Sequence, residues 1–112
     1  MTLFEKIAAR EIPARIVAET PEWLAFHDVN PQAPVHVLIV PKRVIARLDQ
    51  AADEDAALLG RMLLAAPQIA KTLGVAESGY RIAINNGRDA GESVPHLHIH
   101  LLGGRSLQWP PG

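Results

Sequence analysis

Cysteine is absent from this chain of 112 residues, which excludes disulfide bonds, thiolate nucleophiles and cysteine-ligated zinc. The chain also lacks any apolar run near the ~20 residues of a membrane-spanning helix, and its first residues show no signal-peptide pattern. These absences predict a cytoplasmic protein with no membrane partner.

An excess of charge of one sign is also missing, because 11 basic residues stand against 12 acidic ones and the net charge is −1. This balance gives no general attraction to nucleic acid, so a phosphate ligand would need a local site. With 48% hydrophobic and 21% charged residues, the composition is typical of a globular protein with a modest core. We expect one domain over residues 1–112.

The apolar pattern predicts an α+β fold with five strands and two main helices. A capping-box pattern at Thr2 and Glu5 begins the first helix, and Asp49–Leu73 is the predicted second helix. Pro67 inside this helix predicts a bend near residue 63 or two consecutive helices. The predicted strands have short connections, which favour antiparallel pairing. These strands span residues 14–19, 23–28, 35–40, 79–85 and the stretch 93–104.

Three of the five histidines, His96, His98 and His100, alternate with aliphatic residues. Strict alternation predicts a strand that presents all three imidazoles on one face, about 6.5–7 Å apart along the chain. Burying three imidazoles costs desolvation free energy for each ring, so a purely structural role for the triplet is unfavourable. The triplet therefore indicates a functional site.

Two kinds of site fit the triplet. A metal could bind a His-x-His pair, with His100 or His36 as a third ligand, although the triplet contains no carboxylate. Alternatively, one imidazole could attack phosphorus while its neighbours donate hydrogen bonds. The preceding loop favours phosphate, because its backbone N–H groups and one hydroxyl can face an anion. Those groups belong to Gly87, Gly91, Ser93 and Val94.

Phe26 and Asp28 share one face of a predicted strand, which would suit a nucleoside. The base would pack on Phe26, and Asp28 would accept hydrogen bonds from two ribose hydroxyls. A core phenylalanine and a turn-forming aspartate explain the same pattern equally well. His36 interrupts an otherwise apolar strand, so we expect it to be hydrogen-bonded to a neighbouring histidine.

The segment His96–Leu102 resembles the histidine-triad (HIT) motif, His-φ-His-φ-His-φ-φ with φ apolar, at every position. Further segments resemble the Hint branch of that family, so that the likeness covers essentially the whole chain. These segments are Arg10–Ala14, Ala25–Asp28, Pro31–His36, Val40–Lys42, Leu102–Arg105 and Trp109–Gly112.

The resemblance implies a five-stranded antiparallel sheet that joins the sheet of a second copy into a continuous ten-stranded sheet, and hence a homodimer. It implies hydrolysis of purine nucleoside phosphoramidates such as adenosine 5′-phosphoramidate, and of aminoacyl-adenylates, with no cofactor and no metal. AMP or GMP would be ligands. Two alternatives stay open: a nucleotide-binding interaction module with little turnover, and a dinucleoside polyphosphate hydrolase.

The resemblance also implies a role for each residue of the site. His98 would be the nucleophile and form a nucleotidyl-histidine intermediate, while His100 and Ser93 would contact the phosphate and the leaving group. His96 and His36 would form a supporting hydrogen-bond chain. The implied nucleotide-binding residues are Asp28, Phe26, Val29, Leu3, Phe4, Ile7, Ile12, Asn85, Gly91, Val94 and Trp109.

Trp109 and Glu92 also bear on the expected site. Trp109 lies in a tail with two prolines and a glycine, outside any regular element, and would either reach the partner's site across the dimer or pin the tail to its own core. Glu92 stands where the family often has glutamine, and its negative charge would lie beside the expected anion site.

Overall fold

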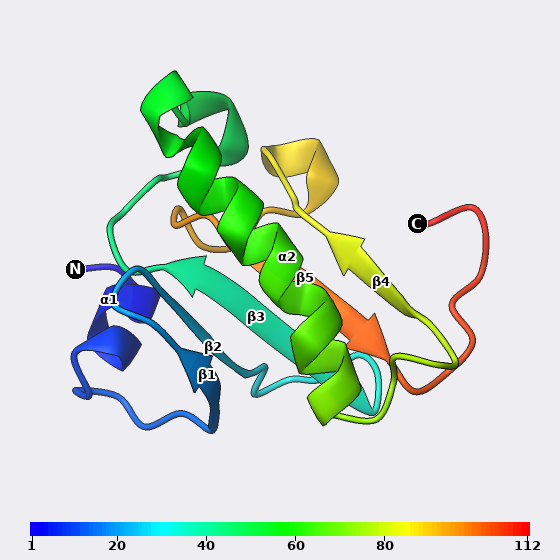
Figure 1. Cartoon of the computed structure of the whole chain (residues 1–112). Helices are drawn as coiled ribbons and strands as arrows, with labels where there is room; N and C mark the ends of the chain where they lie inside the picture. The colour runs from blue at the N-terminus through cyan, green and yellow to red at the C-terminus, as the bar shows by residue number, and fades with distance from the viewer.

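The computed structural model describes residues 1–112 and contains one five-stranded sheet with two helices (Figure 1). All strand pairs are antiparallel, in the order β1-β2-β3-β5-β4, which confirms the predicted sheet. The elements are α1 (Leu3–Ala8), β1 (Ile16–Glu19), β2 (Trp23–His27), β3 (Val35–Pro41), α2 (Ala56–Thr72), β4 (Tyr80–Ala83) and β5 (Ile99–Gly103). No helix is long and apolar enough to cross a membrane.

The central strand β3 is covered on both faces, as its nearly continuous apolar sequence predicts. Val37 and Ile39 belong to the larger core, together with the buried stripe of α2. Leu38 and Val40 point to the opposite face and pack with Phe4 and other residues of a smaller core. Side chains alternate along a strand, so β3 joins the two cores and places α1 and α2 on opposite faces of the sheet.

The second helix begins later than predicted. Residues 48–50 and 53–55 form two 3₁₀ turns, and α2 starts at Ala56. Asp55 accepts a hydrogen bond from the Ala52 N–H at 2.8 Å and pairs with Arg43, so its side chain caps the 3₁₀ turn 53–55 and makes no capping bond to α2 itself.

Pro67 lies inside α2, and the prediction of two consecutive helices around it is wrong. Figure 1 shows one continuous helix across the sheet. Leu63, whose carbonyl oxygen loses its helical donor to the proline ring, is 42% exposed. This exposed turn continues through the proline without that one hydrogen bond.

The histidine strand is shorter than predicted, because β5 begins only at Ile99. The alternation nevertheless extends upstream of the strand: Leu97, Ile99 and Leu101 all lie in the larger core. Leu97 donates its N–H to the Ile45 carbonyl oxygen at 2.6 Å, outside the sheet ladder. Of the triad, only His100 lies in a regular strand.

Gly103, at the end of β5, provides a test of this packing. A Cβ atom added there would lie 2.9 Å from Val75 Cβ and 3.1 Å from both of its γ carbons. We expect Gly103→Ala to lower the free energy of unfolding by about 1–3 kcal/mol, because the added methyl group would overpack the core around Val75. Denaturant titration measures this loss.

Gly60, inside α2, is the matched control, since nothing lies within 4 Å of its added Cβ. Gly60→Ala should stabilise the protein by about 0.5–1 kcal/mol through helix propensity. Equal effects of the two substitutions would contradict the close approach of Val75.

Candidate active site

A cavity of about 320 Å³ opens between α1 and the sheet, and nine of its fourteen lining residues are hydrophobic. Its polar groups come from Asp28, Ser93, His98 and His100. Such an apolar cavity with a few converging polar groups suits a small ligand with one apolar and one polar part. The nine hydrophobic residues are Leu3, Phe4, Ile7, Ile12, Ala14, Phe26, Val29, Leu38 and Val94, and Pro13 completes the lining.

The cavity unites most of the residues singled out in the sequence, but not all of them. His36 and His96 lie behind the lining, while Asn85, Gly91 and Trp109 lie outside it. Pro13, Ala14 and Leu38 also line the cavity, although the sequence alone did not indicate them. Leu38 could have been found, because it lies two positions after His36 and therefore on the same face of β3.

Phe4 of α1 joins the apolar part of the cavity to the histidines. Its ring centroid lies 5.7 Å from that of Phe26, 5.4 Å from that of His96 and 5.0 Å from that of His98, all in edge-on geometry. Edge-to-face contacts of this kind stabilise aromatic clusters beyond the effect of burial alone. The short N-terminal helix thus fixes one wall of the cavity against the triad.

His98 has a defined tautomer. Its Nδ1 lies 2.8 Å from the carbonyl oxygen of His96, and a carbonyl can only accept, so Nδ1 carries the proton. In the neutral ring the lone pair then resides on Nε2. His98 lines the cavity, so Nε2 is the nitrogen that can attack a ligand.

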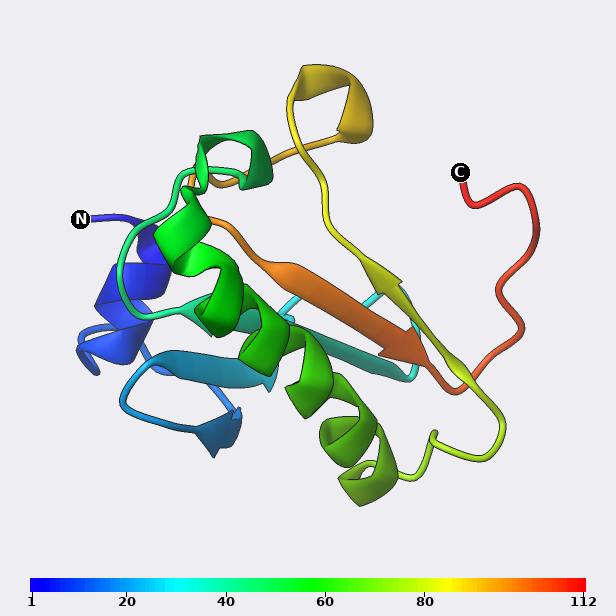
Figure 2. The same ribbon diagram turned by 45° about the horizontal axis from the view of Figure 1, so that its top comes forward.

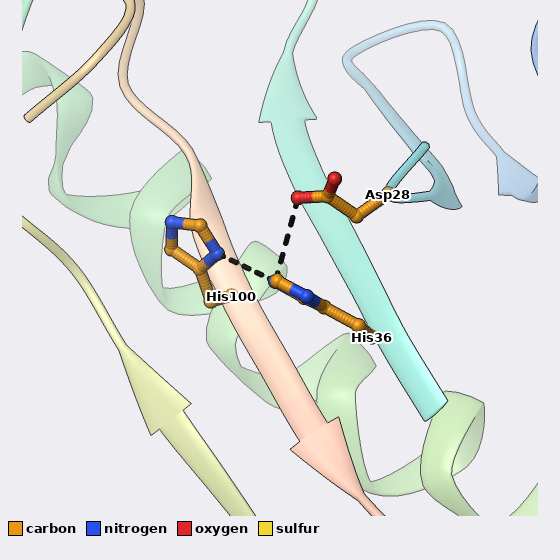
Figure 3. Close-up of side chains that lie close together, drawn as sticks. All are labelled: Asp28, His36 and His100. Atoms are coloured by element: carbon orange, nitrogen blue, oxygen red, sulfur yellow. Dashed lines mark hydrogen bonds and ion pairs between the residues drawn. The ribbon is translucent and has the colours of Figure 1, made fainter. Parts of the chain in front are cut away.

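His36 and His100 form a second fixed pair. The Gln32 N–H donates to His36 Nδ1 at 3.0 Å, so His36 carries its proton on Nε2 and donates it to His100 Nδ1 at 2.9 Å. The expected bond between His36 and a neighbouring histidine is therefore present (Figure 3). His100 in turn keeps its own proton on Nε2, where it is a hydrogen-bond donor at the cavity.

Burial keeps these rings neutral. Burial lowers the pKa of His100 to about 4, with His98 and His36 acting in the same direction and Asp28 opposing them. Burial likewise lowers the pKa of His36, against the opposing effect of Asp28, whose Oδ2 lies 3.5 Å from His36 Nε2. His100 therefore presents a neutral N–H donor at pH 7.

Asp28, His36 and His100 are the one group whose potential metal-ligand atoms converge, within 4.8 Å of one another (Figure 3). The donor set does not fit a metal, because the Gln32 amide requires a proton on His36 Nε2 and leaves that nitrogen no lone pair. One imidazole and one carboxylate remain, fewer than the three protein ligands of a catalytic zinc site.

His96 is fully buried and belongs to a different network. Its Nε2 donates to the Pro41 carbonyl oxygen at 2.7 Å, so its Nδ1 accepts from the Thr2 hydroxyl, also at 2.7 Å. Burial lowers the pKa of His96, with the Pro41 bond opposing this effect. The implied chain of His96 and His36 is not formed. His36 lies opposite Leu102 in the β3–β5 register and reaches His100 instead.

Trp109 is 81% exposed, so it does not pin the tail to the core of its own chain. In Figures 1 and 2 the C-terminal tail lies beyond β4, on the side of the sheet away from α1. Arg81 of β4 donates to the carbonyl oxygen of Gln108 at 3.0 Å. The tail therefore follows the edge of the sheet and does not approach the cavity of the same chain.

The fold and the site define a small α+β protein with paired histidines at the polar end of one apolar cavity. The HIT domain family model matches residues 9–107, so the chain belongs to the HIT family. It is 55% identical to an uncharacterised HIT-like protein of Synechocystis over 99% of this chain and 96% of that one.

Solved structures show the same similarity. A HIT family hydrolase from Legionella pneumophila superposes with a TM-score of 0.97, at 47% identity and with 100% of both chains covered. A histidine triad nucleotide-binding protein from Candida albicans gives a TM-score of 0.83 at 34% identity, with 98% of this chain and 83% of that chain covered.

The contact between Thr2 and His96 links the helix cap to the triad. Thr2 Oγ1 also accepts from the Glu5 N–H at 3.1 Å, completing the predicted capping box. We expect Thr2→Val to lower the free energy of unfolding by about 2–3 kcal/mol, because it removes a cap and leaves a buried ring nitrogen without a donor. Thr2→Ser keeps both bonds and should change it by less than about 0.5 kcal/mol. Equal losses from the two substitutions in denaturant titrations would refute this link.

Proposed function

We propose that this protein hydrolyses purine nucleoside phosphoramidates such as adenosine 5′-phosphoramidate, and also aminoacyl-adenylates, through a covalent nucleotidyl intermediate on His98. The observation that carries the proposal is the bond from His98 Nδ1 to the His96 carbonyl oxygen. It leaves a nucleophilic Nε2 at the polar end of an apolar cavity. The segments shared with the Hint branch, including Trp109–Gly112, support the same assignment.

The lining suggests how the nucleotide binds. The purine would occupy the apolar part, between Ile7, Ile12 and Phe26, and Asp28 at the rim would accept from two ribose hydroxyls. The Asn30 N–H donates to Asp28 Oδ1 at 2.8 Å, which holds the carboxylate in place. The phosphate would then lie against Ser93, His98 and His100.

The reaction would proceed by two displacements at phosphorus. In the first, His98 Nε2 forms a bond to phosphorus, and the bond from phosphorus to the leaving group breaks. For a phosphoramidate its electron pair goes to the leaving nitrogen, which takes a proton from solvent; for an aminoacyl-adenylate it goes to the leaving carboxylate oxygen. The imidazolium formed on His98 is stabilised by the Nδ1–H bond to the His96 carbonyl oxygen. Water then attacks phosphorus and loses a proton to solvent. The bond from phosphorus to His98 Nε2 breaks with its electron pair on Nε2, which releases the nucleoside monophosphate and restores neutral His98.

His100 and Ser93 would stabilise the charge on the non-bridging oxygens during both steps. Because His100 is neutral and its Nδ1 already accepts from His36, its Nε2–H is a preorganised donor and not an acid. The Ser93 hydroxyl is the second donor within the lining. Positioning and donor groups of this kind supply most of the catalysis in phosphoryl transfer.

The test is turnover of adenosine 5′-phosphoramidate in the presence of a chelator. His98→Ala should lose several orders of magnitude in kcat, on the order of 10³-fold or more, because the bond-forming atom is gone. His27→Ala, at the end of β2 and outside the cavity lining, should stay near the wild-type rate. Mass spectrometry of quenched turnover should find the nucleotidyl adduct on His98.

Other outcomes would favour the alternatives. Tight AMP binding without turnover would favour an interaction module, in line with the nucleotide-binding name of the Candida albicans relative. Preferred cleavage of a dinucleoside polyphosphate would favour that hydrolase class. Loss of activity with the chelator would favour a metal. Near-wild-type turnover by His98→Ala would disprove the covalent mechanism.

We also propose that two copies join their sheets into one ten-stranded sheet. The free edges are β1 and β4, and the tail with the exposed Trp109 lies along β4. Pairing through β4 would continue the sheet and bring the tail of each copy next to its partner. A large exposed indole is the kind of side chain that is usually buried at an interface.

Sedimentation velocity tests this arrangement. The full chain should sediment as a dimer at micromolar concentration. A chain lacking residues 106–112 should still form the His98 adduct but rank phosphoramidate leaving groups differently, because Trp109 would reach the partner's site. A stable folded monomer would count against the joined sheet, and an unchanged ranking would count against the role of the tail.

A further inference from the structure

Glu92 immediately precedes Ser93, which lines the polar end of the cavity. Its side chain is only 11% exposed, so this is a largely buried carboxylate beside the place where the proposed function puts a phosphate. An unbalanced negative charge there would repel an anionic ligand, since water screens buried charges poorly. Some other group has to balance this charge.

Arg47 supplies that balance with a fork of hydrogen bonds. Its Nε donates to Oε1 at 2.9 Å and to Oε2 at 3.3 Å, and its Nη2 donates to Oε2 at 2.8 Å. The Gly87 N–H adds a fourth hydrogen bond, at 3.1 Å from Oε1. Bonds to Arg47 and Gly87 hold the pKa of Glu92 at about 2, so the pair is an ion pair at neutral pH.

The same contacts close the loop in front of the triad. The Glu92 N–H donates to the Gly87 carbonyl oxygen at 3.2 Å, which closes residues 87–92 into a ring. Asn86 and Asp49 exchange two further bonds, at 3.0 and 3.1 Å, which tie the start of the loop to the segment that carries Arg47. Gly87 and Gly91 have φ of 90° and 85°, conformations that glycine adopts without strain.

From these contacts we propose that Arg47 is a positioning residue for the phosphate site, resting on the function proposed above. It neutralises the Glu92 carboxylate and fixes the loop that carries Ser93 and Val94 into the cavity. The ion pair of Arg47 and Glu92 would thus leave no net charge beside the phosphate, as an uncharged side chain at position 92 would. Arg47 is not among the lining residues, and its side-chain hydrogen bonds all go to Glu92, so its effect passes through that carboxylate.

The test is a double-mutant cycle on ligand binding, read as the Kd for AMP against the Kd for adenosine by calorimetry. The ratio of these two Kd values isolates the contribution of the phosphate group to binding, and it does not depend on turnover. Arg47→Gln leaves the carboxylate unbalanced and should weaken AMP binding about tenfold, while adenosine binding changes less than about threefold. The AMP effect should shrink as salt is raised.

The second arm is the rescue. The double variant Arg47→Gln with Glu92→Gln removes both charges, keeps hydrogen-bonding amides, and should return the AMP-to-adenosine ratio to within about twofold of wild type. Arg61→Gln is the matched control, because Arg61 makes a similar forked pair with Glu22 on an exposed surface outside the cavity. It should leave the ratio unchanged.

The outcomes separate the two proposals. If wild type binds AMP but never turns over a phosphoramidate, the proposed reaction fails while the cycle still decides the role of Arg47. If Arg47→Gln weakens AMP and adenosine equally, or if the double variant is not rescued, the pair is merely structural and the inference is overturned. If wild type fails to bind AMP, both proposals fail. Thermal unfolding curves show whether each variant is folded at the temperature of the binding measurements.

Discussion

The hydrogen bond from His98 Nδ1 to the carbonyl oxygen of His96 is the constraint on which the site depends. That carbonyl is free to accept it because residues 96–98 precede β5 and do not take part in the sheet ladder. Pro41 lies at the same end of the sheet. It has no N–H to donate to the ladder, and its carbonyl oxygen accepts a hydrogen bond from the His96 ring. The irregular segment before β5 therefore fixes the tautomer of His98.

The other rings are held in the same manner, by groups whose hydrogen-bonding role cannot change. A backbone N–H at Gln32 fixes His36, and His36 then fixes His100. Because burial keeps His36, His96 and His100 in their neutral forms, each ring has one donor and one acceptor in a known position. The ion pair of Arg47 and Glu92 confines the charge of the Glu92 carboxylate to a neutral cluster. The result is a polar end with directed donors.

Periodicity in the sequence predicted the sheet, both helices and the buried face of the histidine segment, because these follow from local patterns of apolar residues. It did not predict where α2 and β5 begin, since a 3₁₀ turn capped by Asp55 stands in place of the first turn of α2, and Pro41 has no N–H with which to extend the ladder to β5. The partners of Glu92 and His96 were also missed. Arg47 and Thr2 are 45 and 94 residues away from them, and only the folded chain brings these residues together.

The most direct test of this account is the tautomeric state of the four rings, read from ¹⁵N NMR of histidine-labelled protein at neutral pH. The neutral His98 ring should carry its proton on Nδ1, while His36, His96 and His100 carry theirs on Nε2. A neutral His98 ring with its proton on Nε2 would contradict the claim that the backbone of His96 prepares His98 as the proposed nucleophile.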